Sequence, residues 1–114
     1  MTNHKDLPYL QHIMDAIENI ENSIGNISRE QFISSKDLID ANIRRIEIIG
    51  EAVKNLSKAL KDKNKEIEWN KIAGTRDIVI HKYFNVDLGV VWNILKKDIP
   101  SFKEDLQKIM KKMS

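Results

Sequence analysis

The chain has 114 residues and no cysteine, and its formal net charge is +2 at pH 7. That length suits one domain, spanning residues 1–114, and is too short for two. The lack of cysteine excludes disulfides, zinc sites with thiolate ligands and a cysteine nucleophile. The amino terminus lacks the apolar run of a signal peptide, and no stretch approaches the roughly 18 uninterrupted apolar residues of a membrane span. We therefore expect a cytoplasmic protein with no membrane partner.

A first helix is predicted to begin near Asp6, a typical N-cap residue, with Pro8 in its first turn, and to end at Gly25. His4 and His12 lie eight residues apart, without the spacing or the acidic neighbours of a helical metal pair, so we interpret both as surface residues. The apolar residues of this segment recur every three or four positions, which predicts one buried stripe. The stripe contains Leu7, Leu10, Ile13, Met14, Ile17, Ile20, Ile24 and Ile27.

Ser28 and Gln31 have the spacing of a capping box, which indicates a short turn of helix carrying Phe32. The second main helix is expected over Asp37–Lys61, because apolar residues again follow helical spacing. Gly50 lies inside this helix, where a glycine is tolerated only if something packs against the backbone.

The charged residues of the chain leave two interpretations open. Arg44 can form an ordinary helical ion pair with Asp40, whereas Arg45 could face a partner subunit or RNA. Two lysine clusters are more often solvated surfaces than phosphate contacts, and a net charge of +2 does not decide between these roles. The clusters are Lys58, Lys61, Lys63, Lys65 and Lys71, and, near the end of the sequence, Lys108, Lys111 and Lys112.

The second half of the chain predicts three more segments of helix. The charged stretch 61–68 is expected to be a loop, and a central helix is expected to follow it over residues 69–84. Asp87 is placed to cap the next helix, and Pro100 suits the first turn of a last one. No alternating pattern indicates strands, so we predict an all-α, up-and-down bundle of four to five helices.

The central helix, WNKIAGTRDIVIHKYF, contains most of the polar chemistry of the chain. Arg76 and Tyr83 fall on one helical stripe, but His81 lies about 140° round the helix from Arg76. A shared site therefore requires the helix to loosen near its end, or a second copy of the helix to face the first, which indicates a dimer. Ala73 and Gly74 are small enough to let another backbone approach closely.

The residue types in this helix suit metal-free chemistry on a phosphate ester, and we predict no metal and no cofactor. The chain has no phosphate-binding glycine loop, no HExxH and no serine triad. His81 could move a proton between a ribose 2′-OH and the leaving oxygen, while Arg76 stabilises the developing charge. Asp77 could orient Arg76 or a water, or be an ordinary exposed residue. Tyr83 could stack on a base, donate a hydrogen bond or be modified.

Four segments of the chain resemble the HepT-like toxin family of the HEPN superfamily. They are YLQHIMDAI, RRIEIIGEAVKNLS, WNKIAGTRDIVIHKYFNVD and VVWNILKKDIP, and they cover nearly the whole length. The strongest element is RDIVIHKY, which is similar to the family signature of an arginine, four to six residues and a histidine, with a tyrosine two residues later. Together the segments are specific, whereas the short motif alone would recur by chance.

The resemblance implies a HEPN-like homodimer in which the motif helices face each other across a cleft. It implies a metal-independent endoribonuclease toxin that acts on RNA, with Arg76 and His81 as its catalytic pair. It also implies a partner, a minimal nucleotidyltransferase antitoxin that silences the toxin by transferring AMP to the motif tyrosine, which is Tyr83 here. The residue after the arginine is frequently Asn in the family and is Asp77 in this chain, which adds a negative charge near the scissile phosphate.

Two other hypotheses remain open at the level of sequence. The first is a HEPN-like dimer that binds a nucleotide or a nucleotidyltransferase without cutting RNA. The second is a purely structural dimer in which Arg76 and His81 satisfy one another at the interface.

Overall fold

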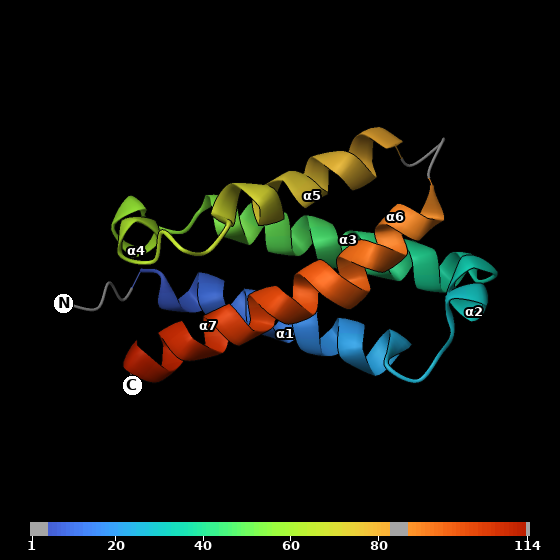
Figure 1. The fold of residues 1–114 in the computed structure, drawn as a ribbon, viewed down its shortest axis with the longest axis horizontal. Helices are drawn as coiled ribbons and strands as arrows, with labels where there is room; N and C mark the ends of the chain where they lie inside the picture. Colours follow the sequence, from blue (N-terminus) through green and yellow to red (C-terminus); the bar gives the residue numbers. More distant parts are fainter. Residues whose placement is uncertain (1–4, 83–86, 114) are drawn as a thin grey trace.

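Four long helical segments run up and down along one axis in a computed structural model of the chain (Figure 1). The structure describes residues 5–82 and 87–113, with backbone only at 80–82. The segments are α1 (Leu7–Ile24), α3 (Lys36–Lys54), α5 (Trp69–Lys82) and a last one made of α6 (Leu88–Asn93), the π-helix η2 (Ile94–Asp98) and α7 (Ile99–Met113). Two short helices, α2 (Arg29–Ile33) and α4 (Lys58–Lys63), lie at opposite ends of the bundle. The all-α bundle predicted from the sequence is confirmed.

The core forms where the apolar stripes of these helices meet. Helix α3 packs against both α1 and α5, and α7 packs against α1. Complete burial of a Leu, Ile or Phe side chain stabilises a fold by about 1.5–3 kcal/mol. The largest fully buried side chains are Leu10, Ile13, Ile17, Ile20, Ile24, Phe32, Ile46, Ile49, Leu95, Ile99, Phe102 and Leu106. The stripe predicted for the first helix supplies five of them.

The end of the second main helix differs from the prediction of Asp37–Lys61. Helix α3 stops at Lys54, and Ser57 starts the separate helix α4 by accepting a hydrogen bond from the backbone N–H of Leu60 at 3.1 Å. A serine hydroxyl competes well for such backbone donors, so Ser57 favours a new helix start over helix continuation. Helix α4 also occupies the first part of the predicted loop 61–68 and ends at Lys63, with Asn64 as its C-cap.

Side-chain caps form at two further helix starts, and a third predicted cap is absent. The predicted capping box is present, since Ser28 Oγ accepts from Gln31 N at 3.1 Å and Gln31 Oε1 accepts from Ser28 N at 2.8 Å. Asp87 caps α6 as predicted, by accepting from Gly89 N at 2.9 Å. Asp6 precedes α1 but does not cap it with its side chain. Its buried carboxylate instead accepts from the N–H and the hydroxyl of Ser57, at 2.7 and 2.6 Å, which ties α1 to the start of α4.

Pro100 does not separate two helices, although it lies in the first turn of α7 as predicted. The backbone is helical without a break from α6 through η2 into α7. Within η2 the N–H of Ile99 donates to the carbonyl of Ile94, five residues earlier. A proline lacks an N–H and its ring crowds the preceding turn, and the wider π-turn accommodates both effects.

Candidate active site

Arg76 lies where α5 comes closest to α3. A Cβ atom placed on Gly50 of α3 would lie 2.7 Å from Arg76 Cβ and 3.3 Å from the carbonyl oxygen of Ala73. Only a glycine permits this approach, so the predicted packing against Gly50 is confirmed and its partner is α5 of the same chain. The close approach expected at Ala73 is therefore made to α3. A Cβ on Gly74, in contrast, would meet nothing within 4 Å.

Two carboxylates flank the guanidinium of Arg76. Its Nε lies 3.7 Å from Glu51 Oε2 on α3, and its Nη1 lies 3.7 Å from Oδ1 of the neighbouring Asp77. Both distances exceed the range of a charge-assisted hydrogen bond, so these are ion pairs without tight bonding. The Arg76 side chain is 34% exposed and that of Asp77 is 56% exposed. The arginine therefore remains reachable by a ligand, and Asp77 lies beside it, as the orienting role requires.

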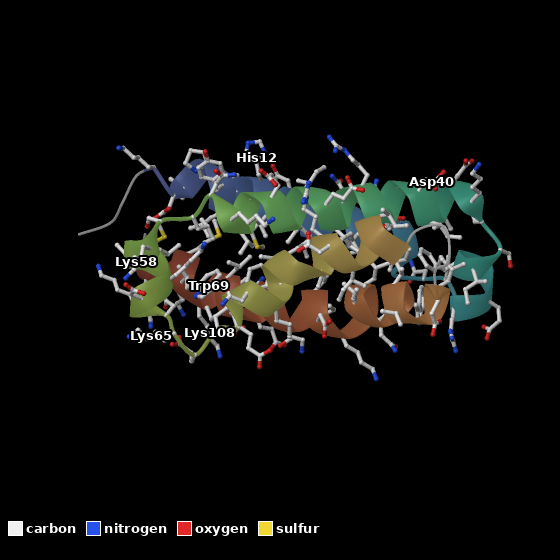
Figure 2. The ribbon with its side chains drawn as sticks, turned by 90° about the horizontal axis from the view of Figure 1, so that it is seen from above. His12, Asp40, Lys58, Lys65, Trp69 and Lys108 are labelled. Atoms are coloured by element: carbon white, nitrogen blue, oxygen red, sulfur yellow. The ribbon has the colours of Figure 1, made fainter. Side chains whose placement is uncertain are left out.

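Arg76 also lines a surface pocket of about 390 Å³. The pocket lies over α1 and α3, and its other lining residues are Tyr9, His12, Arg44, Glu47, Ile48, Glu51, Ala52 and Asn55. A second pocket of about 400 Å³ continues it along the same two helices. His12 is exposed, as predicted, and Figure 2 shows it on the outer side of α1. Sequence reasoning did not identify His12, Tyr9 or Glu51 as neighbours of Arg76.

The histidine and tyrosine of the motif lie at the edge of the described residues. His81 belongs to the last turn of α5, but its side chain lies outside the described residues, and Tyr83 lies outside them altogether. The backbone of α5 is α-helical through Lys82, which keeps positions 76 and 81 about 140° apart. The structure thus brings Arg76, Asp77 and Glu51 together, while the approach of His81 to Arg76 stays a prediction.

Away from the pocket, ion pairs form both within a helix and between distant segments. Lys58 Nζ lies 2.7 Å from Asp62 Oδ2, and this hydrogen bond raises the pKa of Lys58 and lowers the pKa of Asp62. Figure 2 shows Lys58, Lys65 and Lys108 toward the end of the bundle that carries α4, away from the α2 end.

Among the residues that the structure describes, no group of three or more histidines and carboxylates could hold a metal ion. Nor is any helix in that part of the chain both long and apolar enough to cross a membrane.

The protein is an all-α bundle with an arginine, Arg76, in the middle of its third long helix. This arginine forms ion pairs with two carboxylates and lines a surface pocket. Comparison with known proteins identifies the family. The model described as Ribonuclease HepT-like matches residues 13–109, and the chain belongs to this HepT-like family. The resemblance drawn from RDIVIHKY and its neighbouring segments is confirmed.

Several relatives align with most of the chain. A protein named "Probable ribonuclease HepT" from Thermococcus cleftensis is 45% identical over 108 residues, which cover 95% of this chain and 96% of that protein. One named "Putative RNase TTE0752" from Caldanaerobacter subterraneus is 40% identical over 105 residues, or 92% and 94% of the two chains. "Gamma-glutamylcyclotransferase and putative RNase MJ0434" from Methanocaldococcus jannaschii is 50% identical over 105 residues, which cover 92% of this chain. This chain spans only 47% of that protein's length. No solved structure matches the chain.

Proposed function

We propose that the protein is a metal-independent endoribonuclease toxin that acts as a homodimer. The observation that carries this proposal is Arg76, the arginine of RDIVIHKY, held in a surface pocket at the α3–α5 contact of a HepT-like chain. The ribonuclease names of relatives that align with most of this chain support RNA as the substrate.

The proposed reaction is an attack by a ribose 2′-oxygen on the adjacent phosphorus. His81 takes the proton from the 2′-OH as the new P–O2′ bond forms, and it delivers that proton to the O5′ leaving oxygen as the P–O5′ bond breaks. The products are a 2′,3′-cyclic phosphate and a 5′-hydroxyl end. Arg76 stabilises the negative charge that develops on the phosphoryl oxygens with a permanent charge and a planar fork of donors. Asp77, beside Arg76, orients the guanidinium.

A dimer supplies the geometry that one straight helix lacks. Positions 76 and 81 point about 140° apart on a single α-helix, so we propose that Arg76 and His81 converge when two copies of α5 face each other across a cleft. Ile78 lies between them in sequence and is 38% exposed in the single chain. The proposed dimer would cover Ile78 with the second copy of α5.

The proposed partner is a minimal nucleotidyltransferase antitoxin that transfers AMP to Tyr83. Tyr83 follows His81 by two residues in the motif, so an AMP group on it would place a phosphate and a base next to the catalytic histidine. Modification would thereby block access of RNA. We propose that both proteins act in the cytoplasm, where their RNA and ATP are found.

The first test is cleavage of end-labelled RNA by the purified protein in excess EDTA. We expect cleavage that leaves 2′,3′-cyclic phosphate ends, and a fall of about 10²-fold or more in the His81→Ala protein, since general acid–base catalysis contributes about 10²–10⁴-fold. The His12→Ala protein is the matched control, because His12 is an imidazole in the pocket of Arg76 but outside the motif. Its activity should fall far less than that of the His81→Ala protein.

The other outcomes separate the alternatives. Equal cleavage by the parent and the His81→Ala protein would contradict the proposed mechanism. Binding of a nucleotide or a nucleotidyltransferase without any cleavage would favour a non-catalytic HEPN module, provided that the intact mass shows Tyr83 without AMP. If the Arg76→Ala protein no longer dimerises but its RNA cleavage is unchanged, the purely structural dimer is favoured.

A further inference from the structure

Two adjacent residues of α3 hold Arg76 at two points along its side chain. Gly50 leaves the space that the Arg76 stem occupies, with 2.7 Å between Arg76 Cβ and the position of a Cβ on Gly50. Glu51, the next residue, lies 3.7 Å from Arg76 Nε. The stem and the head of one arginine are therefore both placed by the same turn of a neighbouring helix.

Glu51 and Asp77 differ in what they can do for the guanidinium. Asp77 is the next residue of α5, so its ion pair with Arg76, at 3.7 Å, orients the guanidinium only relative to its own helix. Glu51 reaches Arg76 from α3, so it orients the guanidinium relative to the rest of the bundle. Its side chain is 61% exposed, and an exposed ion pair of this kind contributes little to folding. Stability is thus a poor reason for a carboxylate at this position.

We propose that Glu51 is a positioning residue for Arg76 in RNA cleavage, an inference that rests on the function proposed above. The carboxylate attracts the Nε side of the guanidinium from a distance longer than a hydrogen bond. The planar fork consequently keeps donors that can bind the oxygens of a phosphate. Glu51 holds the fork in one direction at the pocket and does not itself contact the reacting atoms.

The chain provides a matched control one helical turn earlier. Glu47 lines the same pocket from α3, but its carboxylate pairs with Arg44, at 3.9 Å, rather than with Arg76. Glu47→Gln and Glu51→Gln remove the same charge from the same face and preserve side-chain size. A general electrostatic effect on RNA would change both proteins equally, whereas positioning of Arg76 depends on Glu51.

The experiment measures single-turnover cleavage of end-labelled RNA with enzyme in excess, so that slow variants remain measurable. We expect Glu51→Gln to lower the maximal rate about 10- to 100-fold, because a small misplacement of a positioned group costs up to about 100-fold. The RNA concentration that gives the half-maximal rate should match that of the parent. The urea concentration at the unfolding midpoint should also be unchanged. Glu47→Gln should lower the rate clearly less than Glu51→Gln does, because Glu47 pairs with Arg44. Glu51→Gln should have no further effect in an Arg76→Ala background.

Three results would overturn the inference. They are a parent-like rate for Glu51→Gln, an equal loss for Glu47→Gln, and a loss from Glu51→Gln that persists when Arg76 is already alanine. The His81→Ala protein, measured in parallel, keeps this inference separate from the proposed function. If the parent cleaves RNA and His81→Ala does not, a silent Glu51→Gln contradicts the positioning role alone. If His81→Ala cleaves like the parent, the proposed function itself fails.

Discussion

Two glycines of the site helices have opposite surroundings. A Cβ on Gly50 would collide with the stem of Arg76, whereas a Cβ on Gly74 would enter open space. Alanine favours a helix over glycine by about 1 kcal/mol, but overpacking costs about 1–3 kcal/mol. We expect Gly50→Ala to lower the free energy of unfolding by up to about 2 kcal/mol and Gly74→Ala to raise it by up to about 1 kcal/mol, both measured by urea denaturation.

Comparison of Gly50→Ala with Gly74→Ala tests whether contact with α5 is what requires a glycine at position 50. Equal losses at both positions would show that contact with α5 is not what requires Gly50. A loss at Gly74 that grows on dilution would instead indicate a second chain packed against that side of α5.

At the scale of the element, the π-helix η2 provides a lysine that connects two helices. Lys96 Nζ donates to the carbonyl of Ile24, at 3.2 Å, at the carboxyl end of α1. The same ammonium lies 5.0 Å from the centre of the Trp92 ring, and Trp92 itself packs against Phe32 of α2 with ring centres 5.3 Å apart. A cation near a helix carboxyl end satisfies an otherwise unpaired carbonyl and is favoured by the helix dipole.

Lys96→Met should therefore destabilise the protein by about 1–2 kcal/mol, the range expected for one charged hydrogen bond and one cation–π contact at a partly exposed site. Lys97→Met is the control, because Lys97 is the exposed neighbour in the same π-helix. Urea denaturation compares the two. A loss of similar size at Lys97 would assign the effect to the charge of η2 as a whole rather than to the contacts of Lys96.

At the scale of the whole molecule, the proposed dimer predicts a special role for the outer surface of α5. Ile78 is 38% exposed there, and Leu7, at the start of α1, is similarly exposed at 43%. Burying a new carboxylate at an apolar interface is costly. We expect Ile78→Glu to weaken dimerisation at least about tenfold, or about 1.4 kcal/mol, in sedimentation equilibrium. Leu7→Glu should leave the dimer intact.

Either of two observations would contradict this assignment of the interface. A fully dimeric Ile78→Glu protein would place the interface elsewhere, and a parent that is monomeric at all concentrations would remove the dimer from the proposal. Loss of RNA cleavage together with loss of the dimer would support a site completed by two chains.

Local features of the fold were predictable from the sequence, and several residue pairs were not. The all-α class, the buried stripe of α1, the capping box at Ser28 and the cap at Asp87 all follow from residues within a few positions of each other. The boundary near Ser57 was missed because the apolar spacing continues through Leu56 and Leu60, while the hydroxyl of Ser57 starts a new helix. The roles predicted from the motif for Arg76, Asp77, His81 and Tyr83 all stay predictions.

Most of the helices and the motif could be recognised from the sequence, because helical periodicity, caps and short spacings depend on neighbours along the chain. Which groups meet across helices became known from the packed structure. Asp6 binds Ser57, 51 residues away, and Glu51 of α3 flanks Arg76 of α5. Such pairs depend on how closely and at which turn two helices pack, and here one missing Cβ, at Gly50, sets that approach. No local pattern encodes that meeting point, because it is a property of two surfaces together.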